Sequence, residues 1–194
     1  MDTATITACL VGGAVGDSMG LPYEALSARR ARRWSRGPLA QRFVFGHGMV
    51  SDDTDHTVFV AQALLRSDGN VDKFRRVLAW RLRLWLLCLP AGIGFGTLRG
   101  ILKLWLGLRA SGVRSAGNGP AMRSALIGAC LPADDERRRA FVTTSATLTH
   151  TDPRAIAGAL AVAEVAARIA TGEWRHRPDA ATFARVVAHV HAAP

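Results

Sequence analysis

Apolar residues recur at helical spacing along most of this chain, and strict alternation of apolar and polar residues is scarce. The helical period is typical of helices with one buried face, whereas alternation is typical of half-buried strands. Nothing in the pattern demands a sheet, so the sequence predicts an all-α fold. The chain has 194 residues and is 49% hydrophobic, which suits one domain with a sizeable core. We therefore expect a single domain over residues 1–194, and this composition excludes a disordered tail or a disulfide-built miniprotein.

Turn signals and capping residues divide the pattern into separate helices. A polar turn cluster at residues 67–70 ends one of them, and Pro120 suits the first position of another. The predicted helices are 4–15, 54–66, 71–89, 100–108, 119–130, 134–148, 153–171 and 180–191.

The most apolar stretch, residues 77–108, does not predict a membrane span. Its longest uncharged run has 15 residues, 84–98, and is interrupted by Pro90 and by glycines. A span needs about 20 apolar residues, so we expect a buried helix, a break and a second helix. A basic interfacial helix is the alternative. The N-terminal segment lacks a basic region, so we expect no signal peptide.

Charge and cysteine content narrow the class of partner only slightly. A formal net charge of +10 admits nucleic acid, membrane surfaces and anionic metabolites. The arginine-rich segment 29–36 around Trp34 and the run 137–139 favour nucleic acid, but no helix-turn-helix or zinc-finger pattern accompanies them, so we expect no nucleic-acid partner. The three cysteines show no CxxC spacing, which favours reduced thiols and a cytoplasmic protein.

Four polar segments hold the candidate functional residues. They are residues 16–20 with Glu24, residues 51–54, residues 117–119 with Met122 and Arg123, and residues 149–153. Ser51, Asp52 and Asp53 offer hard oxygen donors suited to Mg²⁺ or Mn²⁺, and Asp55 adds an acid nearby. The same residues suit a helix start, where Ser caps and acids meet the helix dipole. From the residues alone, both interpretations stay open.

The other segments are also ambiguous when each is taken alone. The loop 117–119 precedes a helix, where backbone N–H groups suit a phosphate or ribose oxygen, but an ordinary turn has the same composition. His150 suits a structural histidine, a ligand contact or acid–base chemistry. Glu24 alone suggests a surface acid, and Asp17 suggests a helix cap or a residue that orients a partner.

In this order, the segments together resemble the ADP-ribosylglycohydrolase family, which includes the dinitrogenase-reductase-activating glycohydrolases. The shared pattern is Gly-Asp-x-x-Gly with a following Glu, Ser-Asp-Asp-Thr, Gly-Asn-Gly-x-x-Met-Arg and Thr-His-x-x-Pro-x-Ala, and it covers roughly residues 6–168. The resemblance implies an all-α orthogonal helical bundle. It also implies two divalent metals, Mg²⁺ or Mn²⁺, that assist hydrolysis of the glycosidic bond linking ADP-ribose to a protein side chain or small acceptor.

The resemblance further implies a role for each matching residue. Ser51, Asp52 and Asp53 correspond to metal ligands. Glu24 and Asp53 correspond to the catalytic acids beside the scissile ribose, and Asp17 to a supporting acid. The implied substrate-binding residues are Gly117, Asn118, Gly119 and His150.

One departure from the family pattern limits these expectations. Family members carry a second acidic motif, Asp-x-Asp-Thr, that completes the metal ligands, whereas the acids after Asp152 here are isolated. We therefore expect the N-terminal part of the fold without its C-terminal helices, an at most partly formed metal site, and weak or absent hydrolysis. An uncovered apolar face would favour self-association. The alternatives are a non-catalytic module that binds ADP-ribose or a nucleotide, and a degenerate structural paralogue.

Overall fold

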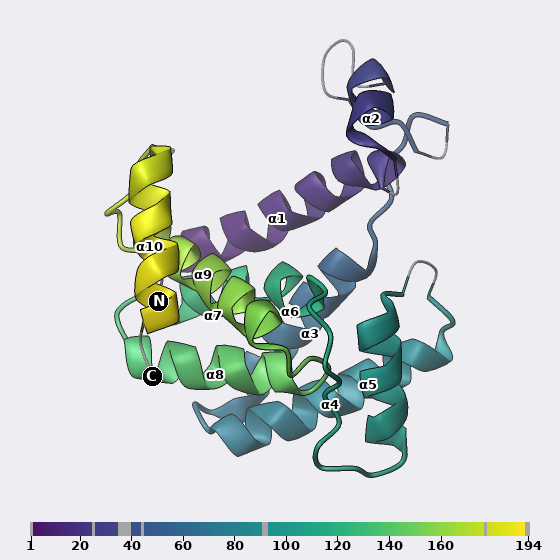
Figure 1. Ribbon diagram of the computed structural model, residues 1–194, viewed down its shortest axis with the longest axis vertical. Coiled ribbons are helices and arrows are strands. Elements are labelled where there is room, and N and C mark those ends of the chain that lie inside the picture. Colours follow the sequence, from purple (N-terminus) through teal and green to yellow (C-terminus); the bar gives the residue numbers. More distant parts are fainter. Residues whose placement is uncertain are drawn as a thin grey trace.

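The computed structural model describes residues 2–24, 26–34, 40–43, 45–90, 93–176 and 178–192, and its regular structure is helical (Figure 1). Within these ranges no strand forms, and β-type pairing is limited to isolated bridges between Phe43 and His47 and between Val113 and His150. The predicted all-α class is confirmed.

Most helices begin at polar caps that the sequence provides. Their bounds are α1 (Thr3–Gly20), the 3₁₀ turn η1 (Leu21–Tyr23), α2 (Ala28–Trp34), α3 (Asp52–Ser67), α4 (Val71–Leu87), α5 (Phe95–Trp105), α6 (Gly119–Met122), α7 (Ala125–Cys130), α8 (Asp135–Thr147), α9 (Pro153–Ala170) and α10 (Ala180–Ala192). The side chains of Asp2, Asn70 and Asp152 accept hydrogen bonds from backbone N–H groups in the first turns of α1, α4 and α9. Such caps satisfy donors that a helix start would otherwise leave unpaired.

The structure corrects several predicted helices. The helix expected over 119–130 is two helices, α6 and α7, because the chain leaves helical geometry at Arg123, whose side chain is fully buried among distant partners. The helix expected over 100–108 begins at Phe95 and ends at Trp105, before Gly107 takes a positive φ of 72°. Helix α1 continues past residue 15 to Gly20, and α2 was not predicted at all.

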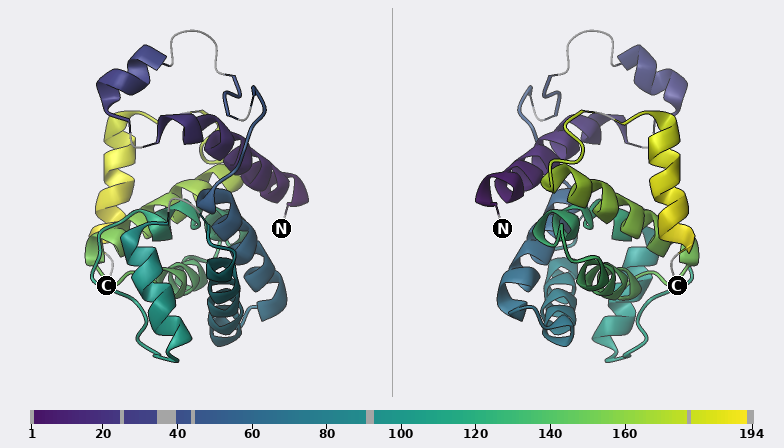
Figure 2. Two further views of the ribbon diagram at one scale, coloured as in Figure 1. Left: turned by 90° about the vertical axis from the view of Figure 1, so that its right-hand side faces the viewer. Right: turned by 90° about the vertical axis from the view of Figure 1, so that its left-hand side faces the viewer.

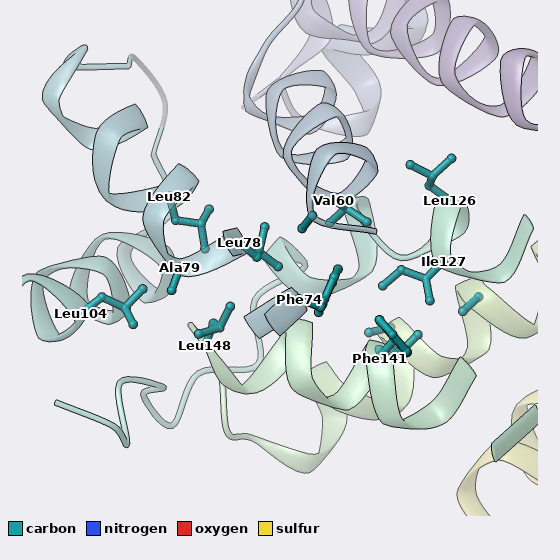
Figure 3. Packing of buried hydrophobic residues seen from close by; sticks show 14 of the residues in the cluster. Val60, Phe74, Leu78, Ala79, Leu82, Leu104, Leu126, Ile127, Phe141 and Leu148 are labelled. Carbon is teal, nitrogen blue, oxygen red and sulfur yellow. The ribbon is translucent and has the colours of Figure 1, made fainter. Parts of the chain in front are cut away.

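The core lies where α3, α4, α7, α8 and α9 pack together (Figure 3). Phe74 of α4 meets Phe141 of α8 edge-on, with ring centroids 5.0 Å apart. Helices α7 and α9 approach so closely that a Cβ added to Gly128 would lie 2.0 Å from the Ala163 carbonyl oxygen. Only glycine fits there. The buried faces of α4 and α5 also belong to this core, as predicted for residues 77–108.

The described residues of α2 and α10 contribute nothing to this core cluster. Helix α2 lies beyond the far end of α1, and α10 stands at one side of the bundle (Figure 2). Residues 35 and 36 of the arginine-rich segment lie outside the described residues.

An apolar groove of about 860 Å³ runs between α1, α7, α9 and α10. This groove is consistent with the expected uncovered apolar face, and self-association through it stays a prediction.

Helix α1 is apolar yet little buried. Among the described helices, only the segment Thr3–Tyr23 is long and apolar enough to cross a membrane, judged by length and composition. Core helices of other proteins and N-terminal signal sequences meet the same criterion, so this finding is weak evidence for a span.

Candidate active site

Asp17, near the end of α1, holds the start of α3. Its Oδ2 accepts hydrogen bonds from the backbone N–H of Ser51 at 2.8 Å and of Thr54 at 3.2 Å. The Ser51 hydroxyl donates to Oδ1 at 2.7 Å, and the Thr54 hydroxyl donates to Oδ2. Burial alone would raise the pKa of Asp17, but these hydrogen bonds outweigh burial and lower it. An ionised Asp17 therefore fixes how α3 enters the fold.

Ser51 is the N-cap of α3, which is one of the two roles left open by its sequence. Its Oγ accepts a hydrogen bond from the Asp53 N–H at 3.4 Å while donating to Asp17. A hydroxyl has two acceptor positions, so one remains for another partner. Asp52 and Asp53 follow in the first turn, where the positive end of the helix dipole favours their negative charge.

Three carboxylates line one cleft, which has a volume of about 430 Å³. They belong to Glu24, Asp52 and Asp53. Burial raises the pKa of all three, and mutual repulsion adds to it, chiefly from Glu24 on Asp52 and from Asp52 on Asp53. In the part of the chain that the structure describes, no arginine or lysine forms an ion pair with any of them. The cleft therefore holds negative charge that a cationic ligand would balance.

The same cleft is lined by His150 and glycine-rich segments. Its lining includes the start of α5, Ser115 and residues 117–119. His150 is only 2% exposed, and a Cβ added to Gly96 or Gly117 would lie 2.6 Å or 3.1 Å from its Nε2. Both glycines therefore make room for the imidazole. The cleft thus combines carboxylates with an imidazole and exposed backbone.

The structure brings the predicted residues together, some lining the cleft and others supporting it. Glu24, Asp52, Asp53, His150 and the loop 117–119 all line the cleft. Asp17 and Ser51 lie behind the acids and hold the start of α3. Asp55 does not join the acidic cluster, because its Oδ2 accepts a hydrogen bond from Trp85 Nε1 at 2.9 Å.

Several residues that line the cleft were not predicted from the sequence. Phe95, Gly96, Thr97 and Ser115 contribute to the cleft without belonging to any recognised motif. The available signal was the glycine-interrupted apolar run before α5, which we interpreted only as a break between helices. That break places the uncapped start of α5 beside the cleft, since Gly94 provides no side-chain cap.

The donor set only partly fits a metal centre. Among the described residues, no group of three or more His, Cys, Asp or Glu side chains is arranged to hold a metal ion. Mg²⁺, however, is usually held by one or two carboxylates, with water filling the other positions. Asp52 and Asp53, with the free acceptor position of Ser51, suit one partly hydrated ion of this kind. They do not suit the complete two-metal centre that the resemblance implies.

Comparison with known proteins decides the family. The ADP-ribosylglycohydrolase family model matches residues 2–193. The chain belongs to this family. An uncharacterized protein of Escherichia coli K12, YegU, is 31% identical over 191 residues, which cover 89% of this chain and 56% of YegU. An uncharacterized protein of Archaeoglobus fulgidus is 32% identical over 164 residues, which cover 80% of this chain and 52% of that protein.

Family membership confirms the resemblance on which the site residues were chosen. As an ADP-ribosylglycohydrolase family member, the chain spans about half the length of the curated relatives it matches. Neither relative carries a characterised activity in its name. The substrate, the metal and the role of each residue in this chain are therefore matters for proposal.

Proposed function

We propose that the cleft binds an ADP-ribosyl group and that its carboxylates promote hydrolysis of the bond between the ribose C1 atom and an acceptor. One observation carries this proposal. Three carboxylates that pair with no cationic side chain among the described residues share a cleft with an imidazole and a glycine loop. Positive charge develops at C1 when a glycosidic bond breaks, and nearby carboxylates stabilise it. The family model supports the same class of reaction.

The phosphates of such a ligand are expected to lie at the glycine-rich side. Gly117 and Asn118 are exposed and line the cleft, so their backbone is accessible to a ligand. The start of α5 adds N–H groups that no side chain caps, and such groups favour anions. We therefore assign Gly117, Asn118 and Gly119 to the pyrophosphate and neighbouring ribose. His150 is assigned to the polar groups of the sugar.

The acids are proposed to act at the scissile bond. The raised pKa values of Glu24 and Asp53 make both carboxylates stronger bases than usual. In the reaction a water oxygen bonds to C1 while the bond from C1 to the acceptor breaks. One of the water's protons passes to a carboxylate, which returns it to the departing acceptor, so the reaction consumes one water and leaves the carboxylate ionised. Asp17 supports the reaction indirectly, because it holds the start of α3, which carries Asp52 and Asp53.

We also propose that Mg²⁺ or Mn²⁺ binds at Asp52 and Asp53 with help from Ser51. When bound, such an ion would orient ribose hydroxyls and acidify water in the cleft. Because the described residues supply few ligands, we expect weak affinity for the ion and weak or absent turnover.

A second candidate function is binding of ADP-ribose, or of a nucleotide, without turnover. It is favoured by the glycine loop, His150 and the start of α5, which need no metal to form their part of the cleft. The two candidates differ in how binding responds to removal of divalent cations.

Calorimetric titration of ADP-ribose into the purified chain, with Mg²⁺ and again with EDTA, tests both candidates. Binding that weakens at least tenfold in EDTA, and in Asp53→Asn, supports the metal-assisted function. Binding indifferent to EDTA supports the second candidate. A chain that is helical by circular dichroism and binds in neither condition contradicts both. Asp2→Asn, an equivalent change at the exposed cap of α1, should leave affinity unaltered.

A further inference from the structure

A fully buried arginine lies directly behind the cleft. Arg123 is 0% exposed, and among the described residues no carboxylate pairs with it. Burial lowers the pKa of its guanidinium to about 10, so it stays charged at neutral pH. A buried charge is costly unless its hydrogen bonds are satisfied.

The hydrogen bonds of Arg123 all go to neutral groups. Its Nε donates to Ser145 Oγ at 2.9 Å, and its Nη2 donates to the Ser145 carbonyl at 2.8 Å and to Thr149 Oγ1 at 2.9 Å. Its Nη1 lies 3.3 Å from His56 Nδ1. A guanidinium only donates, so each of these partners must accept. His56 is therefore neutral, with its proton on Nε2.

The Thr149 hydroxyl connects Arg123 to His150 and thereby affects which ring nitrogen of His150 is protonated. Thr149 Oγ1 lies 2.9 Å from His150 Nδ1. Because the hydroxyl oxygen already accepts from Arg123, its proton is free to point at Nδ1. Burial and the charge of Arg123 lower the pKa of His150 to about 4, so the imidazole is neutral near pH 7. A neutral imidazole that accepts at Nδ1 carries its proton on Nε2.

The backbone around His150 is held on several sides. The Thr149 carbonyl accepts from the Val113 N–H at 3.0 Å, and the Thr151 N–H donates to the Val113 carbonyl at 2.9 Å. The His150 N–H donates to the Ala146 carbonyl at 2.8 Å. These bonds fix the backbone position of His150. Only the orientation and the protonation of its ring remain to be determined.

His150 Nε2 is the ring nitrogen available to a ligand. It lies against Gly96 and Gly117, which line the cleft together with Ser115. No described residue hydrogen-bonds to His150 Nε2, and this nitrogen is not fully buried. It is therefore open to the cleft.

We propose that Arg123, acting through the Thr149 hydroxyl, is a positioning residue that holds neutral His150 as a hydrogen-bond donor into the cleft. The group it meets is an oxygen acceptor, such as a ribose hydroxyl or a phosphate oxygen. The ligand part of this inference rests on the proposed function, whereas the protonation of the ring does not. His150 then selects for an oxygen at one place in the ligand and does not act as a base there.

The decisive measurement is the ¹⁵N spectrum of the histidine rings in the ligand-free protein, with His150 assigned by its loss in His150→Gln. The test variant is Thr149→Val, which removes the hydroxyl at nearly constant shape. Thr149→Ser is the matched control, since it keeps the hydroxyl. His56 is an internal reference, because it contacts Arg123 and not Thr149.

In the wild-type protein we expect a protonated Nε2 and a hydrogen-bonded, unprotonated Nδ1 for His150. In Thr149→Val the Nδ1 resonance should move to the position of a nitrogen without a donor, or average with a protonated form, while His56 stays unchanged. Affinity for ADP-ribose should fall about threefold to tenfold, as for loss of one hydrogen bond. Thr149→Ser should restore both readouts.

A wild-type His150 that carries its proton on Nδ1 overturns the inference, and so does an Nδ1 resonance unchanged in Thr149→Val. A loss of affinity in Thr149→Val without a change at Nδ1 also overturns it, because the hydroxyl would then act on packing alone. If the wild-type chain does not bind ADP-ribose, the proposed function fails, and the spectra still decide whether the Thr149 hydroxyl, which Arg123 contacts, fixes the protonation of His150.

Discussion

Replacing Asp17 by asparagine tests whether one carboxylate holds α3 and its pocket acids in place. Asp17 accepts four hydrogen bonds from Ser51 and Thr54, two from backbone N–H groups and two from hydroxyls. The amide keeps the shape of the side chain but has only one oxygen. If that oxygen takes the place of Oδ2, the amide NH₂ faces the Ser51 hydroxyl, which must reverse from donor to acceptor.

The expected loss follows from these contacts. Hydrogen bonds to a charged group contribute about 1.5–3 kcal/mol each, and neutral ones about 0.5–1.5 kcal/mol. Asp17 is only partly buried and its bonds share one carboxylate, so the contributions are not additive. We expect Asp17→Asn to lower the free energy of unfolding by about 2–3 kcal/mol. For a chain of this size that corresponds to a fall in Tm of roughly 5–10 °C.

Thermal unfolding followed by circular dichroism measures this loss, and Asp2→Asn is its control. Asp2 caps α1 with bonds from Ala4 and Thr5 but is exposed and forms no part of the cleft. Asp17→Asn should lower both the Tm and the affinity for ADP-ribose, whereas Asp2→Asn should lower the Tm less and leave affinity unchanged. Equal Tm values for the two variants would refute the reasoning.

The same variant predicts a dependence on pH. Hydrogen bonding lowers the pKa of Asp17 in the folded state below its value in the unfolded chain, about 3.9. Its contribution to stability is therefore fully present above that value and is lost as the pH falls through the folded-state pKa. The difference in stability between wild type and Asp17→Asn should be constant from pH 7 to about 5 and should shrink below about 4. A difference that stays constant down to acid unfolding contradicts this assignment.

Two further tests concern packing beside the cleft and the ion pair between α8 and α9. Gly96→Ala should weaken ADP-ribose binding about tenfold or more in calorimetric titration, because its Cβ would lie 2.6 Å from His150 Nε2. The control, Gly12→Ala in α1, has nothing within 4 Å of the added Cβ and should stabilise the chain by about 0.5–1 kcal/mol without changing affinity. Glu164→Leu should cost about 3 kcal/mol in denaturant unfolding, because it removes the carboxylate that Arg138 and Arg168 share and leaves Arg138 with only the exposed Asp135 as an acidic partner. Adding Arg138→Met should recover most of that loss, and a double variant as unstable as the single one would contradict the assignment.

The helices were predictable because their signals are local. Apolar period, turn clusters and caps such as Asn70 and Asp152 act within a few residues, and most predicted helices lie close to the observed ones. The predicted helix bounds were wrong where contacts between residues far apart in the sequence determine the backbone conformation. Helix 119–130 divides at Arg123, whose partners Ser145 and Thr149 lie more than twenty residues further along the chain.

The cleft was predictable only in part. Each motif alone had an ordinary structural explanation, and only their order indicated one site. Periodicity shows which face of a helix is buried, but it does not show which helix ends meet. The start of α5 and Ser115 therefore stayed outside the predicted site, although they line the same cleft as Asp52 and His150.

The burial of Arg123 was the least predictable feature and bears most directly on the cleft. Arginine is almost never fully buried unless it is paired, and the sequence placed Arg123 in a candidate segment without indicating its burial. An unpaired buried guanidinium lowers stability, and an apolar residue of similar size would often fit such a position at lower cost. Arg123 instead hydrogen-bonds to His56, Ser145 and Thr149, and through Thr149 it reaches His150 in the cleft. A buried charge whose hydrogen bonds lead to an imidazole that lines the cleft is better explained by the geometry of the site than by stability of the core.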